Sequence, residues 1–329
     1  MRTENTILVT GAPRSGTTWV GSVLGLPRHV GVIFEPFHPD AGVLGISGER
    51  LAPGGETFRM EFPYIENGHP FAADFNRLFR DMLAGRAPYK RLSAPGRHGW
   101  FTTWARALFT SRVALQNRLT VLSPLHRRLV VKDPHLCLAA EYLHSDMGIP
   151  CLVIVRHPAA TVESWVRLGW NPDLRQFWRQ PALQERYFRR LSPPNPVDLS
   201  PAKQAAWVWV LIHNVLLDFR ERNPDMVFVR LEDIARDPVP AFRALYDRFG
   251  LPFDRRVERT IRAQTEAKTS ALGTSDRPHQ LWRDSRTVLD GWKSRLSPAD
   301  QSAVRRITGD TAASFYSDDT WTPGGLAAG

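Results

Sequence analysis

Short apolar runs alternate along the chain with longer amphipathic stretches. The apolar runs are continuous and rich in β-branched residues, which indicates strands buried on both faces, as in a parallel sheet. We predict strands at residues 6–10, 30–34, 129–131, 151–155 and 226–229. We predict helices at residues 17–26, 136–147, 159–168, 201–222 and 239–249. The alternation of strand and helix predicts an α/β fold around a central parallel sheet.

Two stretches break this pattern. Residues 36–125 are rich in glycine, proline and aromatic residues, with weak helical patterns at 71–83 and 102–119, and residues 264–290 are polar with little periodicity. In α/β enzymes, irregular segments at the carboxyl ends of the strands shape the binding pocket. We interpret 36–125 as a substrate-binding region and 264–290 as a lid. The sequence has no internal repeat and no clear linker, so we predict a single domain over residues 1–329.

The composition is that of a folded, enzyme-sized protein with a basic surface. Hydrophobic residues make up 43% of the 329 residues and charged residues 23%, and the formal net charge is +10. Such an excess attracts anions of several kinds: nucleic acid, anionic lipid or phosphorylated small molecules. The basic residues are scattered, and no recognised nucleic-acid module is present. We therefore expect no nucleic-acid partner, and a non-catalytic polyanion-binding protein stays as an alternative.

Cysteine usage and the N-terminal sequence bear on the compartment. The two cysteines, Cys137 and Cys151, fit a reducing environment, and neither has the spacing of a metal ligand. The N-terminus leads directly into the first predicted strand without the apolar core of a signal peptide. The most apolar predicted helix is too short to span a bilayer, which needs about 20 apolar residues. We expect a cytoplasmic protein with no transmembrane segment and no metal.

The junction between the first strand and the first helix is typical of a phosphate-binding loop. Glycines at 11 and 16 allow close approach of the backbone, and the N–H groups at a helix start bind phosphate. The side chains that add charge and hydroxyl donors are Arg14, Ser15, Thr17 and Thr18. The spacing imitates a Walker A loop, but Thr17 replaces the lysine that a P-loop kinase needs. A small-molecule kinase with a degenerate loop is the second alternative.

A second anion site is predicted where the strand 151–155 ends. Arg156 follows that strand, Pro158 opens the next helix, and Ser164 lies eight residues after Arg156 on the second turn. A guanidinium fork beside a hydroxyl is a suitable receptor for a phosphate. Taken alone, an arginine at the end of a strand is more often structural, so these residues by themselves leave both roles open.

These motifs closely resemble those of sulfotransferases that use 3′-phosphoadenosine-5′-phosphosulfate (PAPS). Residues 13–19, P-R-S-G-T-T-W, resemble the 5′-phosphosulfate loop of the carbohydrate-type and bacterial members, and Arg156 with Ser164 matches the 3′-phosphate motif. The resemblance implies a P-loop-like three-layer αβα fold, PAPS as the donor and adenosine 3′,5′-bisphosphate as the product. It implies donor-binding roles for Arg14, Ser15, Gly16, Thr17, Thr18, Arg156 and Ser164.

The resemblance continues toward the C-terminus in two weaker motifs. The stretch 229–238, V-R-L-E-D-I-A-R-D-P, is similar to an acidic motif that precedes a C-terminal helix in the family, and we interpret it as architectural. The stretch 283–293 looks like a diverged form of a late family motif that ends in Trp-Lys. Counting back from Trp292 places Arg286 where a lysine binds the 3′-phosphate, although the surrounding signature is broken.

Sulfuryl transfer needs cations at the transferred group and a base for the acceptor's proton. Arg14 is one candidate cation, and Lys132, at a strand end, is where the family often places a lysine. For the base we favour Glu35, which resembles the proposed base in an F-E-P stretch and whose pKa we expect burial to raise. His135 is the rival, one residue out of register with the lysine–x–histidine motif of cytosolic-type members, and His38 is a third candidate.

The acceptor cannot be derived from these residues. Residues 36–125, which we interpret as the acceptor-binding region, are rich in aromatic residues and arginine. They suit a small-molecule, carbohydrate or lipid-linked acceptor with a hydroxyl or amine group. The sequence around Glu35 favours a carbohydrate or another aliphatic hydroxyl. The sequence analysis therefore predicts a PAPS-dependent sulfotransferase.

Overall fold

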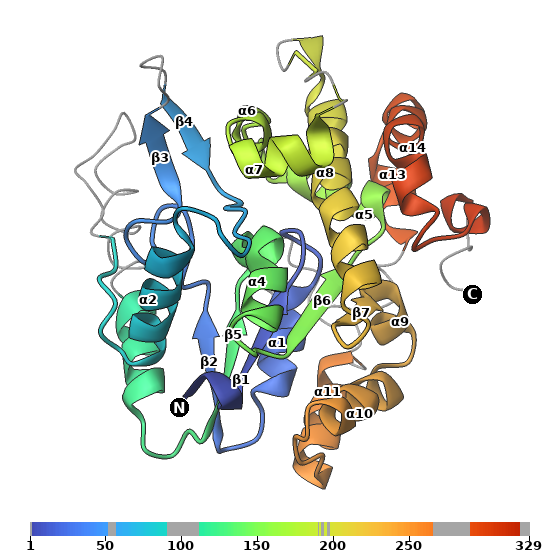
Figure 1. Ribbon diagram of the computed structural model, residues 1–329. Coiled ribbons are helices and arrows are strands. Elements are labelled where there is room, and N and C mark those ends of the chain that lie inside the picture. The colour runs from blue at the N-terminus through green and yellow to red at the C-terminus, as the bar shows by residue number, and fades with distance from the viewer. Residues whose placement is uncertain are drawn as a thin grey trace, which may run out of the picture. The chain divides into compact units, whose positions relative to one another are not determined.

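The computed structural model describes residues 2–51, 57–90, 112–189, 191, 194–195, 198–265 and 290–322 (Figure 1). Its larger sheet has the strand order β2-β5-β1-β6-β7. The strands are β1 (Thr6–Thr10), β2 (Val30–Phe34), β5 (Arg128–Lys132), β6 (Cys151–Val155) and β7 (Val227–Arg230). β5 runs parallel to both β1 and β2. The predicted α/β fold, with a mostly parallel central sheet flanked by helices, is confirmed, and each predicted strand is present to within one residue at either end.

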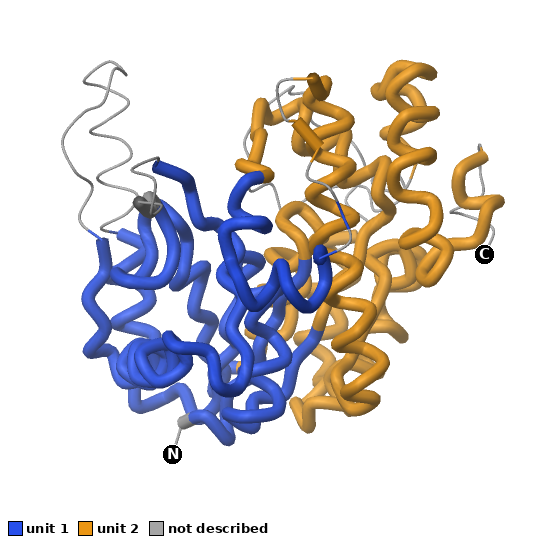
Figure 2. The backbone as a smooth tube through the Cα atoms, turned by 45° about the horizontal axis from the view of Figure 1, so that its top comes forward, with its two compact units in different colours: residues 1–11, 28–152, 175–193 blue, residues 12–27, 153–174, 194–329 orange. Residues whose placement is uncertain are grey.

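The chain divides into two compact units, each built from separate stretches of sequence (Figure 2). The first unit comprises residues 1–11, 28–152 and 175–193. The second comprises residues 12–27, 153–174 and 194–329. The boundary after Gly11 falls inside the predicted phosphate loop. The organisation of the chain as a single domain stays a prediction.

In the first unit, a helix packs aromatic side chains against the segment that leaves β2. This helix is α2 (Ala72–Leu83), as predicted, and Phe75 and Phe79 on it contact Phe37 at ring-centroid distances of 5.7 and 5.9 Å. All three rings are fully buried. Because Phe37 lies two residues after Glu35, this packing fixes the backbone that carries the candidate base.

The remaining elements of the first unit are short. The predicted helix 136–147 begins two residues early as the 3-10 helix η2 (Pro134–Ala139) and continues as α4 (Ala140–Ser145). Of the predicted helix 102–119, residues 102–111 lie outside the described residues, and residues 112–122 are helical. The others are η1 (Arg2–Asn5), β3 (Gly48–Leu51) antiparallel to β4 (Thr57–Met60), α6 (Arg175–Trp178), α7 (Pro181–Leu183) and the π-helix η3 (Gln184–Phe188).

A buried segment without regular structure lies between β4 and α2. Residues 61–65 are all buried, so their backbone groups need partners other than water. The side-chain oxygen of Gln176 accepts from the N–H groups of Glu61 (2.8 Å) and Phe62 (3.0 Å). Gln180 accepts from the Tyr64 N–H at 2.7 Å and donates to the Phe62 carbonyl at 3.0 Å. Two glutamine side chains thus supply backbone hydrogen bonds that a neighbouring strand would otherwise supply.

The second unit is mainly helical. The predicted helices at 17–26, 159–168, 201–222 and 239–249 are confirmed as α1 (Thr17–Leu24), α5 (Pro158–Arg167), α8 (Pro201–Arg222) and α10 (Pro238–Arg248). The additional helices are α9 (Leu231–Arg236), α11 (Arg255–Thr265), α13 (Trp292–Arg295), α14 (Pro298–Ala312) and the 3-10 helix η5 (Asp318–Trp321). α8 packs against both α5 and α14. Of the predicted lid 264–290, residues 266–289 lie outside the described residues.

None of the described helices combines the length and the hydrophobicity that a membrane span needs. The long helix α8 is instead the buried centre of the second unit, with Trp209, Leu211, Ile212 and Leu216 fully buried. Its N-terminus is capped by Ser200, whose hydroxyl accepts from the Lys203 N–H.

We predict that Gln176→Leu lowers the free energy of unfolding by about 2–4 kcal/mol, because it leaves two buried N–H groups without an acceptor. Urea denaturation of the purified protein measures this change. Gln184→Leu, at the start of η3 and away from residues 61–64, is the control and should change stability by under ~0.5 kcal/mol. Equal effects of the two substitutions would contradict the assigned role of Gln176.

Candidate active site

The loop after β1 has an unusual backbone. Arg14 has φ 68° and Gly16 has φ 94°, so two residues separated by Ser15 adopt positive φ. For arginine the left-handed region is sterically costly, and such outliers cluster at functional sites. Left-handed residues in a turn orient neighbouring N–H groups toward one side, which is the geometry of an anion-binding nest. The loop therefore has two of the backbone conformations on which such a nest depends.

The second half of the loop packs closely against the side chain of Leu231. Gly16 is the N-cap of α1, and a Cβ atom at this position would lie 2.4 Å from Cδ1 of Leu231. Close packing and positive φ both require glycine here. The hydroxyl oxygen of Ser15 is fully buried and has no hydrogen-bond partner among the described residues. A bound phosphate oxygen would satisfy it, so the residues present fit an anionic ligand.

The two predicted anion sites are in contact within the second unit. Nη1 of Arg156, at the end of β6, donates to the Arg14 carbonyl at 2.9 Å. Nε of Arg14 lies 3.1 Å from the hydroxyl oxygen of Ser164 on α5. The indole N–H of Trp165 donates to the Pro13 carbonyl at 2.9 Å. Arg14, Arg156 and Ser164 are therefore joined by hydrogen bonds in the second unit.

For the other predicted donor-binding residues the structure gives burial only or no description. Thr17 is buried at the first position of α1, and Thr18 follows it half-buried. Arg286 lies outside the described residues, as does Arg283.

The backbone around Arg156 is fixed by buried partners from α8, α9 and the C-terminal region. The indole N–H of Trp209 donates to the Arg156 carbonyl at 3.1 Å. The carboxylate of Glu232, 2% exposed, accepts from the His157 N–H at 2.9 Å and from the Tyr316 hydroxyl at 2.8 Å. Burial raises the pKa of Glu232. Glu232, from the motif at 229–238, thus fixes the backbone of the residue next to Arg156, the candidate 3′-phosphate ligand.

In the first unit, Lys132 and Glu35 form a buried ion pair. Strands β2 and β5 place Phe34 opposite Lys132, and the Glu35 N–H donates to the Lys132 carbonyl at 2.8 Å. Glu35 has φ 42°, so a second candidate site residue lies in the left-handed region. The Lys132 side chain is 2% exposed and its ammonium contacts both the Glu35 carboxylate and the Phe34 ring. Strand order thus brings two residues 97 positions apart into direct contact.

Lys132 also lies beside the start of the phosphate loop. It pairs with Val9 in the register of β1 with β5, and the Thr10 hydroxyl donates to the Asp133 carbonyl at 2.7 Å. Gly11, the first glycine of the loop, follows directly. The carboxyl ends of β1, β2 and β5 therefore meet where a cation, a carboxylate and the loop entrance are all present.

The pKa of Glu35 is low, and the predicted increase is wrong for this structure. Burial raises this pKa, but the nearby charges of Lys132 and His135 and the hydrogen bond from Lys132 outweigh it and lower it from 4.5 to about 2. The expectation treated the carboxylate as an isolated group among Phe34, Pro36 and Phe37. Glu35 is therefore ionised and tightly paired while Lys132 faces it.

His135 is held in one neutral form. Its Nδ1 lies 3.1 Å from the Glu61 carbonyl oxygen, which can only accept, so Nδ1 carries the proton and Nε2 presents a lone pair. The ring is 6% exposed and stacks on Phe62. Burial lowers the pKa of His135 to about 3, with the charge of His38 contributing in the same direction. His135 thus offers a neutral acceptor near neutral pH.

Asp133 joins the segment after β2 to the start of η2. One of its carboxylate oxygens accepts from the Phe37 N–H at 2.7 Å and the other from the His135 N–H at 2.9 Å. It is fully buried, and burial together with the charge of Glu35 raises the pKa of Asp133 to about 7. Sequence reasoning missed this role of Asp133. The position of Asp133 directly before Pro134 is typical of an N-cap and was a usable signal.

The same cluster contains three atoms of the kind that bind metals. Glu35, His38 and His135 each offer one such atom, all within 4.8 Å of one another. Nδ1 of His38 accepts from the Asp40 N–H at 3.1 Å, which leaves the other ring nitrogen as a donor in the neutral form. Because Lys132 already supplies the cation at Glu35, the arrangement favours proton transfer over metal coordination.

The sequence matches the model of the sulfotransferase family over residues 6–255, and the chain belongs to this family. It is an enzyme that transfers a sulfuryl group from PAPS, and the kinase and polyanion-binding alternatives are not favoured. No curated protein matches the chain.

Three solved structures to which the chain is similar are distant from it in sequence. The sulfotransferase domain from the curacin biosynthetic pathway is 15% identical, with a TM-score of 0.45 over 95% of this chain and 99% of that chain. A sulfotransferase from Mycobacterium avium is 16% identical, with a TM-score of 0.45 over 96% and 78%. Retinol dehydratase in complex with retinol and adenosine 3′,5′-bisphosphate (PAP) is 13% identical, with a TM-score of 0.40 over 94% and 81%.

We predict that Glu232→Leu weakens binding of adenosine 3′,5′-bisphosphate by roughly 10-fold, because the buried His157 N–H loses its acceptor and Arg156 its fixed position. Glu232→Gln keeps an acceptor oxygen and should bind within about threefold of the wild type. Calorimetric titration measures both affinities, and circular dichroism checks that each variant is folded. A folded Glu232→Leu protein with unchanged affinity would show that Glu232 does not position Arg156.

Proposed function

We propose that this sulfotransferase binds PAPS through residues 11–18, Arg156 and Ser164 and transfers the sulfuryl group to a hydroxyl of a small-molecule acceptor. In this proposal Glu35 accepts the acceptor's proton after the donor has drawn Lys132 away from it. The buried Lys132–Glu35 ion pair at the carboxyl ends of β5 and β2 carries the proposal. Arg286 keeps its predicted 3′-phosphate role as a further proposal.

The contacts around Arg14 support the donor assignment. Arg14 and Arg156 supply two guanidinium groups, each suited to bidentate contact with a phosphate. Ser15 supplies a buried hydroxyl for which the described residues offer no partner, and Ser164 supplies a second hydroxyl beside Arg14. Nucleotides with a single 5′-phosphate do not need the lysine of a Walker A loop, which Thr17 replaces.

Lys132 has two anions to neutralise at different stages. In the free enzyme its ammonium pairs with Glu35. The sulfuryl group and the bridging oxygen of the donor carry more negative charge than the Glu35 carboxylate. This charge builds up further on the bridging oxygen as the leaving group departs. Movement of Lys132 toward them removes the main charge that lowers the pKa of Glu35, whereas the burial that raises it remains. Donor binding therefore makes Glu35 a stronger base.

The transfer is an in-line displacement. The acceptor oxygen forms a bond to sulfur while the bond from sulfur to the bridging oxygen breaks, and adenosine 3′,5′-bisphosphate leaves. The proton of the acceptor hydroxyl passes to the carboxylate of Glu35. Lys132 and Arg14 balance the charge on the transferred group and on the leaving phosphate, as cations do in phosphoryl transfer.

His135 has a supporting role in this proposal. Its neutral Nε2 is fixed by the Nδ1 hydrogen bond to Glu61, so it can accept a hydrogen bond that orients the acceptor hydroxyl. Its pKa of about 3 is set mainly by burial, which donor binding does not remove, whereas movement of Lys132 raises the pKa of Glu35, so His135 is the weaker candidate for the base. The Nε2 of neutral His38 is a further candidate donor to the acceptor molecule, because its Nδ1 accepts from the Asp40 N–H.

For the acceptor we propose a small molecule with an aliphatic hydroxyl, such as a carbohydrate or a lipid-linked alcohol. The fully buried rings of Phe37 and Phe62 beside the Glu35–His135 cluster supply apolar support. We further propose a cytoplasmic location, which the two buried free cysteines favour.

The donor assignment predicts that the wild type binds adenosine 3′,5′-bisphosphate and that Arg156→Ala weakens binding by roughly 100-fold, since a charge-assisted phosphate contact is lost. Isothermal titration calorimetry measures both. Arg248→Ala, on the exposed side of α10, is the matched control and should bind like the wild type. Equal affinities of all three proteins would overturn the donor site.

The base assignment predicts that Glu35→Gln lowers kcat by about 100-fold or more, whereas His135→Asn lowers it by roughly 10-fold. Both variants should still bind adenosine 3′,5′-bisphosphate. Turnover is followed by release of that product with an acceptor found by screening alcohols. A larger loss of kcat in His135→Asn than in Glu35→Gln would assign the base to the histidine.

A further inference from the structure

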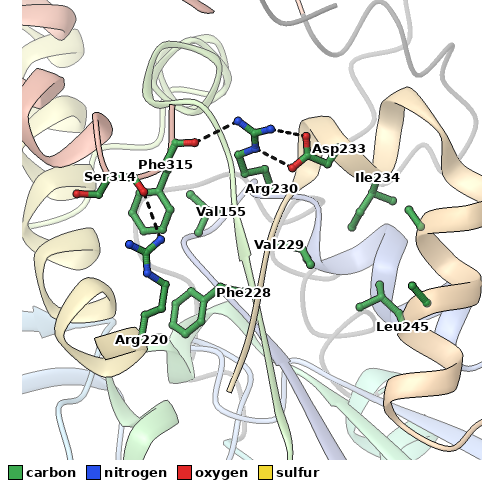
Figure 3. Close-up of a pocket in the computed structure, with 12 residues that line it drawn as sticks. Val155, Arg220, Phe228, Val229, Arg230, Asp233, Ile234, Leu245, Ser314 and Phe315 are labelled. Carbon is green, nitrogen blue, oxygen red and sulfur yellow. Dashed lines mark hydrogen bonds and ion pairs between the residues drawn. The ribbon is translucent and has the colours of Figure 1, made fainter. Parts of the chain in front are cut away.

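A pocket opens in the second unit beside the edge strand β7, and the donor-binding residues do not line it (Figure 3). Its volume is about 340 Å³, which is in the range of small-molecule sites. It is lined by Val155, Arg220, Phe228, Val229, Arg230, Asp233, Ile234, Ala241, Ala244, Leu245, Ser314 and Phe315. Neither the loop 11–18 nor Arg156 or Ser164 belongs to this lining.

The walls of the pocket are apolar on both sides of β7. Phe228 and Phe315 form one wall, and Ile234 on α9 with Leu245 on α10 forms the other (Figure 3). Phe228 and Phe315 are only partly buried, although they pack against the buried side chain of Val155. A pocket with these walls favours a ligand with a flat or extended hydrocarbon body.

The two arginines of the lining differ in their charge balance. Arg230 forms a two-pronged ion pair with Asp233, with N–O distances of 2.7 and 2.6 Å, and donates to the Phe315 carbonyl at 3.2 Å. Its charge is therefore compensated. Arg220 lies over the Phe315 ring at 4.8 Å and donates to the Ser314 carbonyl at 3.3 Å. Within the described part of the chain, no carboxylate pairs with Arg220, so the lining carries one uncompensated positive charge.

We propose that this pocket binds a small amphipathic monoanion, with its carboxylate or sulfate head on Arg220 and its apolar body between Phe228, Phe315 and Leu245. The single uncompensated guanidinium matches one negative charge, and Asp233 disfavours a second one. The apolar walls exclude a free inorganic anion as the preferred ligand, since it would gain nothing from them. Alkyl sulfates and alkyl carboxylates share the required chemistry.

The proposal is tested by calorimetric titration of the whole protein, saturated with adenosine 3′,5′-bisphosphate, with four probes. The two amphiphiles among them are used below their critical micelle concentrations. Octyl sulfate and octanoate each carry the head and the tail, 1-octanol lacks the charge, and sodium sulfate lacks the tail. We expect both amphiphiles to bind with a stoichiometry of one and at least ~10-fold more tightly than 1-octanol or sulfate. The tighter of the two identifies the preferred head group.

Variants locate the binding. Arg220→Gln should weaken octyl sulfate binding by roughly 10-fold or more, and Ala244→Trp, which fills the pocket from an exposed position on α10, should abolish it. Arg222→Gln, two residues further along α8 and outside the lining, is the matched control and should bind like the wild type. Circular dichroism verifies folding. Unchanged binding in Arg220→Gln and Ala244→Trp, or equal binding of 1-octanol, would overturn the proposal.

Discussion

The ion pair between Lys132 and Glu35 is the constraint around which the first unit is built. Two opposite charges that are both largely removed from water persist only because each compensates the other, and loss of either leaves an uncompensated buried charge. The surrounding backbone fixes the pair: β2 and β5 set the register, the Glu35 N–H bonds to the Lys132 carbonyl, and Asp133 ties the following segment to η2. The pair keeps Glu35 ionised but weakly basic, and its opening by the donor's charge is what the proposed mechanism requires.

In the second unit, buried hydrogen bonds fix the position of the candidate cation Arg156. Arg156 reaches the Arg14 carbonyl, its own carbonyl accepts from Trp209, and the next N–H is fixed by Glu232. The non-glycine residues with positive φ in the described part of the chain are Arg14 and Glu35, one in each cluster. Backbone strain at both positions is consistent with sites that are preorganised for an anion and for proton transfer.

Local sequence signals sufficed for most of the fold and for part of the site. Continuous apolar runs located the five strands, and the Pro-initiated helix α8 was placed at its observed ends, because these features depend on neighbours in sequence. What sequence reasoning missed depends on distant contacts: Gln176 supplies backbone partners to Glu61 and Phe62, and Glu232 acts on the residue after Arg156. The direction of the Glu35 pKa shift was wrong for the same reason, since Lys132 is 97 residues away and becomes a neighbour only through the sheet.

The most direct test is the pKa of Glu35 with and without the donor's nucleotide. The carboxyl carbon of Glu35, labelled with ¹³C and assigned by comparison with Glu35→Gln, is followed by NMR during a pH titration. In the free enzyme the pKa should lie near 2, well below the ordinary 4.5. Adenosine 3′,5′-bisphosphate, whose 5′-phosphate attracts Lys132, should raise it above 4.5. A pKa that stays near 2 in the complex would contradict the account.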